Sequence, residues 1–350
     1  MSQEMTRREF LEAAMGTGVF VTTGGLWTAE LSAQATVPVP ESERIVVTVV
    51  TDNLADATRP NVKIARRPAG GKTVVDAAMH AEHGLAYHVE TTVDGKPHAF
   101  LFDFGTQAQG VRRNLDFLNI DFRNVEAMAL SHDHWDHEAA FIELMQAKRG
   151  ELTRVVPLYV GEGFFVGTYA RRPTGQIQTF SVLSRDEVEK LGVVRIVEVT
   201  GPTPIVPGAL LTGRIAQVTD YEKVPPTFLA RKGEEFVQET FVGEQAVVMN
   251  AKGKGLVVLT ACAHRGVVNT VRHAQKMTGV EKVHAIIGGL HLTGAKPETI
   301  ERTIADVKAL RPDYVVPTHC TGFEAMTAFA REMPDQFILS TAGTRYVIEA

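Results

Sequence analysis

One short run constrains this chain more than any other, because four metal-capable side chains lie within six residues, directly after the apolar segment 125–130. The run is His132-x-His134-x-Asp136-His137. Residues two apart in an extended backbone project to the same side, so the first two histidines can converge on one ion. The last two side chains can face a second ion about 3.5 to 4 Å away, as in two-metal hydrolytic sites. Such ligands suit Zn²⁺ and also Mn²⁺ or Fe, so the run predicts a metal centre rather than a polar loop.

Three predicted strand ends in the second half of the chain each present a histidine in a polar turn, as the first half does. These histidines are His264, His291 and His319. Several strand ends aimed at one edge of a sheet are the usual place for a site in α/β proteins, so we expect the histidines to share an ion. The order of elements predicts two βα halves whose sheets pack face to face with helices outside, an αββα sandwich.

Alternation and β-branched runs predict the strands, and spaced apolar residues predict the helices. The segments 55–79 and 161–226 lack clear periodicity, and a variable insertion around 161–243 is the expected place for a substrate lid. The predicted helices are 110–118, 138–148, 267–278, 297–310 and 323–332. The predicted strands are 45–50, 86–92, 98–102, 125–130, 155–160, 193–199, 213–218, 246–250, 256–260, 283–287, 314–316, 337–340 and 344–348.

The histidine-rich run resembles the metal-binding motif of the metallo-β-lactamase superfamily, and further motifs follow in the order typical of that family. Asp103-Phe104-Gly105 matches its early Asp-x-Gly motif. The resemblance implies that Asp103 orients a ligand histidine without touching the metal, with a turn or helix-capping role as the alternative. It also implies the αββα fold. His134 stands where the diiron, oxygen-reducing branch of the superfamily has glutamate, which argues against that branch.

The resemblance also implies a division of the ligands between two metals. His132 and His134 would belong to the first metal. The second metal would take Asp136, His137 and the late histidine, His319.

The chain departs from the family pattern where a bridging aspartate is normally found. The corresponding strand ends in Cys262-Ala263-His264. Either His264 completes the first site, or Cys262 takes the place of the aspartate as a soft ligand. His291 lies where phosphodiesterase-like relatives carry a general acid, so a proton donor and a supporting histidine are both open.

The function implied is metal-assisted hydrolysis of a small ester, lactone or phosphoester. A metal-activated water would attack the substrate, and Asp136 or His291 would manage the proton. A pterin-related synthase-like enzyme and a noncatalytic periplasmic metal-binding accessory protein are the alternatives. Four motifs resemble the dihydropterin or dihydropteroate synthase-like subgroup of the superfamily: Glu82-His83-Gly84, Cys262-x-His264-x-Gly266, Gly288-Gly289-x-His291-Leu292 and Pro317-Thr318-His319-Cys320-Thr321-Gly322.

The first 35 residues have the three parts of an export signal. Arg7-Arg8 precedes Phe10-Leu11, an uncharged stretch covers 13–29, and Ser32-Ala33-Gln34-Ala35 offers a cleavage site. The paired arginines resemble a twin-arginine signal. We therefore expect the twin-arginine translocation machinery as a partner, a periplasmic or secreted location, and no stable membrane anchor after cleavage. The remainder, 36–350, would be one domain with the metallo-β-lactamase fold that the resemblance implies.

The net charge indicates which kind of partner to expect. A formal net charge of -5 gives no basic footprint for nucleic acid, so a small-molecule substrate is expected. The two cysteines, Cys262 and Cys320, allow one disulfide in an oxidising compartment. Both lie beside histidines of the later motifs, and we expect them to be thiols that line the site.

Overall fold

The computed structural model describes residues 36–68 and 78–350. The predicted export signal, residues 1–35, lies outside the described residues and stays a prediction. Among the described residues, no helix combines the length and the apolar character needed to cross a bilayer.

A mixed eight-stranded sheet carries the first half of the site. Its strands are β2 (Arg44–Thr51), β3 (Ala65–Arg66), β4 (Ala86–Val93), β5 (Lys96–Phe104), β6 (Val125–Ala129), β7 (Val156–Gly161), β10 (Val194–Val199) and β19 (Arg345–Glu349). They lie in the order β10-β7-β6-β5-β4-β2-β19-β3. The last strand of the chain, β19, thus pairs with β2 near its start. Strands β5, β6, β7 and β10 run parallel, so their C-terminal ends meet at one edge.

A seven-stranded sheet carries the second half of the site. Its strands are β1 (Glu41–Ser42), β11 (Thr203–Val206), β12 (Ala209–Leu211), β15 (Val247–Ala251), β16 (Gly255–Leu259), β17 (Val283–Gly289) and β18 (Tyr314–Thr318). The main path is β11-β12-β15-β16-β17-β18, and β1 pairs with β15. Strands β16, β17 and β18 are parallel, which brings the three later histidine turns to one edge.

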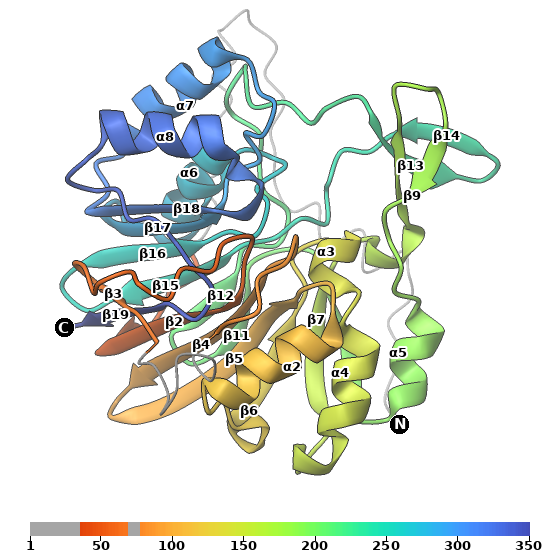
Figure 1. Ribbon diagram of the computed structural model, residues 1–350, viewed down its shortest axis with the longest axis horizontal. Helices are drawn as coiled ribbons and strands as arrows, with labels where there is room; N and C mark the ends of the chain where they lie inside the picture. The colour runs from red at the N-terminus through yellow and green to blue at the C-terminus, as the bar shows by residue number, and fades with distance from the viewer. Residues whose placement is uncertain (1–35, 69–77) are drawn as a thin grey trace, which may run out of the picture. The chain divides into compact units, whose positions relative to one another are not determined.

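Helices cover the outer face of each sheet (Figure 1). The first sheet is covered by α2 (Ala108–Phe117), α4 (Phe141–Lys148) and α5 (Arg185–Leu191). The second is covered by α6 (Val267–Thr278), α7 (Pro297–Ala309) and α8 (Phe323–Glu332). The inner faces pack on each other through a core that draws residues from both sheets. This is the αββα sandwich, and the predicted fold class is confirmed.

Strand β2 shows why a β-branched run forms an inner strand. Every residue of Arg44–Thr51 after the arginine is buried. Ile45, Val47 and Val49 lie in the core between the sheets, whereas Val50 packs under the helices of the first sheet. A strand covered on both faces needs apolar residues at consecutive positions, which is the pattern of this segment.

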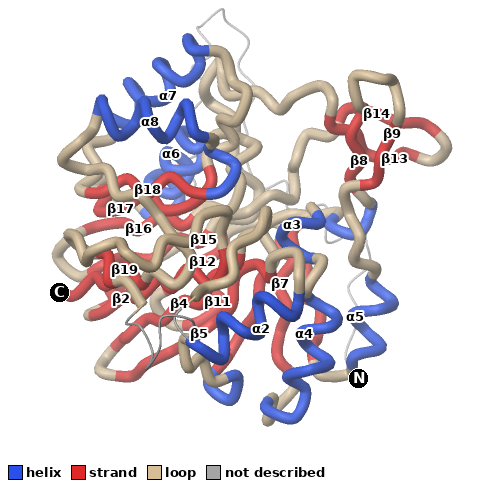
Figure 2. Tube along the Cα trace, in the orientation of Figure 1, coloured by secondary structure: helices blue, strands red, loops and turns tan. Residues whose placement is uncertain are grey.

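The predicted insertion contains more regular structure than its sequence indicated. Strands β8 (Thr168–Arg171), β9 (Ile177–Thr179), β13 (Phe228–Lys232) and β14 (Glu235–Gln238) form a separate sheet (Figure 2). Its strands are short and β14 is wholly exposed, so they carry little apolar alternation. Helix α5 was also missed, although Ser184 and Glu187 form a capping box that marks its start.

Two predicted strands are wrong. Residues 213–218 form no strand, because Gly213 turns the chain at a φ of 60° and the amide of Val218 bonds to Asn269 Oδ1 instead of a neighbouring strand. Residues 337–340 also form no strand, and only Phe337 makes an isolated bridge, to Val315. The predicted helix 138–148 is divided into α3 (Trp135–Glu138) and α4.

A buried histidine outside the site predicts acid sensitivity of the fold. Burial, with the Arg345 guanidinium nearby, lowers the pKa of His88 to about 4, against about 6.5 in an unfolded chain. Between these values the unfolded chain binds more protons than the folded chain. The stability that the neutral His88 gives the fold is therefore fully present above pH 6.5 and is lost as the pH falls towards 4. The loss amounts to about 3 kcal/mol of the free energy of unfolding.

We expect His88→Gln to flatten the fall in stability over this range, as measured by urea unfolding at pH 7 and pH 4.5. The half-buried His98 on β5 gives the control His98→Gln, which should keep the acid sensitivity of the parent protein. An unchanged fall in the His88 variant would show that this side chain does not titrate with unfolding.

Candidate metal centre

The site lies where strands of both sheets end, and its backbone is strained there. Asp103, Ala263, His291 and His319 all have φ between 46° and 60°, a left-handed conformation uncommon for residues other than glycine. Phe241, which stacks on a site histidine, has a φ of 50°. Such strain persists only where surrounding contacts hold it, and it is concentrated at functional sites.

The first cluster joins the two halves of the chain. One ring nitrogen from each of His132, His134 and His264 lies within 4.8 Å of the others. The Nε2 atoms of all three are buried and have no hydrogen-bond partner among the described residues. Buried polar atoms are normally paired, so three converging lone pairs without donors fit a metal ion.

The opposite ring nitrogens are held in place. His132 Nδ1 lies 2.8 Å from Ser131 Oγ, and His264 Nδ1 lies 2.9 Å from Glu244 Oε1. A proton on Nδ1 leaves Nε2 free to bind metal. Burial lowers the pKa of His134 to about 3 and holds those of His132 and His264 well below their usual range. All three are therefore neutral at pH 7, the form that ligates metal.

The second cluster is centred on a carboxylate. Asp136 Oδ2 lies 3.1 Å from His319 Nε2, 3.4 Å from His83 Nε2 and 3.7 Å from His137 Nε2. Burial opposes ionisation of Asp136, yet the imidazoles of His137 and His319 hold its pKa well below the usual range. Burial likewise opposes protonation of His319, but the Asp136 carboxylate outweighs it and raises the pKa to about 9. A carboxylate surrounded by imidazoles is a donor set that suits zinc, and a metal bound there would displace the proton that His319 holds beside Asp136.

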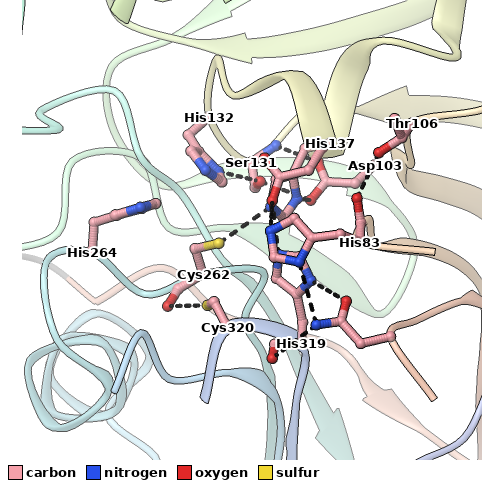
Figure 3. A network of polar contacts seen from close by, with 12 residues as sticks. His83, Asp103, Thr106, Ser131, His132, His137, Cys262, His264, His319 and Cys320 are labelled. Atoms are coloured by element: carbon pink, nitrogen blue, oxygen red, sulfur yellow. Dashed lines mark hydrogen bonds and ion pairs between the residues drawn. The ribbon is translucent and has the colours of Figure 1, made fainter. Parts of the chain in front are cut away.

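Asp103 holds the loop that carries the ligands (Figure 3). Its Oδ1 accepts a hydrogen bond from the Ser131 amide at 2.8 Å, and its Oδ2 accepts one from Ser131 Oγ at 2.7 Å. His137 Nδ1 also lies 2.7 Å from Oδ2. Asp103 thus contacts the Nδ1 side of His137, as the family resemblance implied for an orienting carboxylate. His137 Nε2 is left facing the site.

Cys262 lies between the two clusters (Figure 3). Its Sγ is 3.2 Å from His137 Nε2, and it also shares metal-ligand spacing with His132 and His319. His264 meanwhile lies with the first cluster. The two alternatives are therefore compatible, because His264 can complete the first site while Cys262 occupies the bridging position. Cys262 and Cys320 are both free and buried, so they form no disulfide in this structure.

His291 lies at the side of the first cluster. Its ring centroid is 4.2 Å from that of His264, and its Nδ1 is buried without a hydrogen-bond partner among the described residues. A ring nitrogen of His291 also comes within 4.8 Å of Cys262 Sγ. This position allows either proton donation or support of a ligand.

Sequence reasoning missed three contributors. His83 was used only as part of a motif, yet it faces Asp136. Gly84 lets this segment pack closely, because a Cβ there would meet Thr106 Oγ1 at 2.8 Å and the backbone oxygen of Asp136 at 3.1 Å. Phe241 lies in the insertion and Glu244 directly after it, where no pattern marks them. Phe241 stacks on His264 at 4.0 Å between ring centroids.

Glu244 gives a testable link between the insertion and the first cluster. Its Oε1 accepts from His264 N at 2.7 Å, in addition to its contact with the ring, and its Oε2 accepts from Arg265 N at 2.8 Å. Burial raises the pKa of this carboxyl to about 7. In Glu244→Gln an amide NH₂ would face one of these donors, and His264 would lose its fixed orientation.

We expect Glu244→Gln to weaken Zn²⁺ affinity about 10- to 100-fold, measured by competition with a chromophoric chelator. Glu235→Gln, on the exposed strand β14, is the matched control and should bind zinc as the parent does. Unchanged affinity in the Glu244 variant would mean that His264 does not depend on this carboxyl.

Comparison with known proteins gives the family and the fold. The chain is 30% identical to 7,8-dihydropterin-6-methyl-4-(β-D-ribofuranosyl)-aminobenzene-5′-phosphate synthase of Methanocaldococcus jannaschii, over 75% of this chain and 89% of the relative. A crystal structure of a metal-dependent hydrolase of the β-lactamase superfamily covers 86% of this chain and 98% of its own, with a TM-score of 0.66 and 22% identity. The metallo-β-lactamase-fold protein YhfI of Bacillus subtilis covers 87% and 99%, with a TM-score of 0.50 and 13% identity. No protein-family model matches the chain.

The chain belongs to the metallo-β-lactamase superfamily, and the family predicted from its motifs is confirmed. Within that superfamily it is similar to the pterin-related synthase named above, in agreement with the four subgroup motifs.

Proposed function

We propose that this protein is a metal-dependent hydrolase that acts on a small ester, lactone or phosphoester. The observation that carries the proposal is the convergence of three buried, unpartnered Nε2 atoms from His132, His134 and His264. A second ligand cluster around Asp136 adjoins them. Two Zn²⁺ ions are the proposed occupants, and Mn²⁺ or Fe would also suit the donors.

The ligands divide between the two ions according to their contacts. The first cluster would hold one ion, and the second would use Asp136, His137 and His319, with Cys262 between them. When bound, such ions lower the pKa of water to about 7 and polarise the bond to be broken.

Two side chains are placed to handle the proton. Asp136 is held ionised by its imidazole neighbours, so its carboxylate could accept a hydrogen bond from the attacking water and orient it. His291 lines the same pocket as His134, and its Nδ1 has no competing hydrogen bond among the described residues. His291 can therefore donate to the leaving group, because a general acid must reach the reacting atoms from the pocket wall.

A pterin-related synthase is the second candidate. The 30% identity to the Methanocaldococcus jannaschii synthase favours it, because the two sequences align over most of both chains. The same metal clusters would serve such an enzyme, so the candidates differ in substrate rather than in the centre. A noncatalytic accessory role would need the metal without turnover. We propose export through the twin-arginine route for either enzyme.

A substrate screen tests the hydrolytic proposal. Protein freed of metal by a chelator is reloaded with Zn²⁺ or Mn²⁺ and assayed with carboxyl esters, lactones and phosphodiesters. We expect turnover in one class that depends on the added metal. Metal-loaded protein that hydrolyses none of these classes would contradict the proposal, and product formation from pterin precursors would then support the synthase.

A further inference from the structure

The pocket over the metal clusters has a mostly apolar wall. It has a volume of about 800 Å³ and contains His134, His264 and His319. Its other lining includes Trp135, Phe180, Phe228, Phe323 and Met326. Phe323 is 79% exposed, and Leu54, which also lines the pocket, is 40% exposed. Exposed apolar side chains gathered at a cavity are typical of a ligand-binding surface.

One permanent cation lines this pocket among the described residues, and it is Arg172. The residue follows β8 in the turn towards β9 of the small sheet. Its backbone amide bonds to Gln176 O at 2.8 Å, and its Nε donates to Gln178 Oε1 at 2.7 Å. Its Cζ lies 5.4 Å from the centre of the Phe180 ring. These contacts hold the guanidinium at the pocket, and over the described residues no acceptor takes a hydrogen bond from either Nη.

Phe180 connects this cation to the metal clusters. The Phe180 ring lies 5.2 Å from the His134 ring. The Trp135 amide also bonds to Phe180 O at 2.7 Å, which fixes this part of the insertion to the ligand loop. The Phe180 ring contacts both the guanidinium and His134, so the rings of Phe180 and His134 connect Arg172 to the first cluster.

We propose that Arg172 selects substrates that carry an anionic group at the end remote from the bond that reacts. The substrate class is a small molecule with an apolar or aromatic body and a carboxylate or phosphate tail. A guanidinium with free Nη donors binds either anion through a pair of parallel hydrogen bonds. The inference rests on the proposed function for the position of the reacting bond, and it concerns binding rather than turnover.

Binding of unreactive ligands tests the assignment on the zinc-loaded protein. Terephthalate carries one carboxylate for the metals and a second for Arg172, whereas 4-carbamoylbenzoate replaces the second by a neutral amide of similar shape. 4-Phosphonobenzoate offers a phosphate-like tail in the same position. We expect calorimetry to show at least one anionic tail binding about tenfold more tightly than the amide. The tighter of the two distinguishes a carboxylate substrate from a phosphate one.

The Arg172 variants decide whether this residue is responsible. Arg172→Ala should remove the advantage of the anionic tail, and Arg172→Lys should restore part of it through charge without the paired donors. Arg171→Ala is the matched control, because Arg171 is exposed on β8 and does not line the pocket. The zinc content of each variant is measured first, to show that the metal clusters are intact.

The inference is overturned if Arg172→Ala keeps the tail preference, if Arg171→Ala loses it equally, or if the three ligands bind alike or not at all. The advantage should also shrink at high salt, because the cation is exposed. The binding experiment needs no turnover, so its result holds even if the hydrolysis screen fails. If the ligands do not bind, the hydrolytic proposal is still decided by the substrate screen.

Discussion

His134→Ala is expected to lower metal-dependent hydrolysis by at least about a thousandfold and to reduce bound metal. His134 gives one of the three unpartnered Nε2 atoms of the first cluster, and its ring lies 4.5 Å from that of His132 and 4.8 Å from that of His264. Alanine has no donor atom at this position. Two imidazoles would remain, fewer than the three protein ligands usual at a catalytic zinc.

The measurement combines steady-state rates with metal analysis on the same preparation. His98→Ala is the control, because His98 is half-buried on β5 and contacts Glu126 rather than the site. The control should keep both metal and activity. Full activity in His134→Ala would show that the first cluster does not serve hydrolysis, and metal loss without loss of rate would show the same.

The second large effect is expected for Asp103→Asn, which removes the negative charge of the side chain without disturbing the backbone. Asp103 has a φ of 60°, a conformation that asparagine tolerates. The carboxylate accepts from Ser131 N, Ser131 Oγ and His137 Nδ1. An asparagine NH₂ in the place of Oδ2 would face donors, so His137 would have to move its proton from Nδ1 to Nε2. That proton would block the nitrogen that faces the site.

We expect Asp103→Asn to weaken metal binding about 10- to 100-fold and to lower the free energy of unfolding by about 2 to 4 kcal/mol, because a fully buried polar group loses partners. Zinc competition and urea unfolding measure the two effects. Asp94→Asn is the matched control, since Asp94 is also left-handed, with a φ of 50°, but lies in the exposed β4–β5 turn. A zinc affinity unchanged in Asp103→Asn would contradict an orienting role for this carboxylate.

The sequence predicted the parts of the fold that have strong local patterns. The run 45–50 became β2, and 297–310 became α7, because continuous β-branched residues and a proline-started apolar face each favour one structure. The small sheet of the insertion was missed, since β14 has no buried residue to mark an alternation. The strand predicted for 213–218 was wrong because a tertiary contact with Asn269 overrides the strand preference of its β-branched residues.

In the candidate site too, residues marked by a local pattern were predicted and residues placed by tertiary contacts were missed. The ligands of the histidine-rich run are close in sequence, so their spacing alone indicates a shared ion. His264 and His319 required the further assumption that successive strand ends meet at one edge. Glu244 contacts His264 only because the segment that follows the insertion folds onto a strand end, and no local pattern predicts such a contact. His83 likewise depends on Gly84 and the close packing around it.

The most direct test of the central claim is the metal content per chain of protein purified without chelator, measured by plasma emission spectrometry. We expect about two equivalents of a divalent metal, zinc above others, because two donor clusters adjoin one another. Replacing His132 and His264 together should remove one equivalent and leave the Asp136 cluster loaded. Protein that holds no divalent metal, even after reloading with Zn²⁺ and dialysis, would show that these clusters are not metal sites.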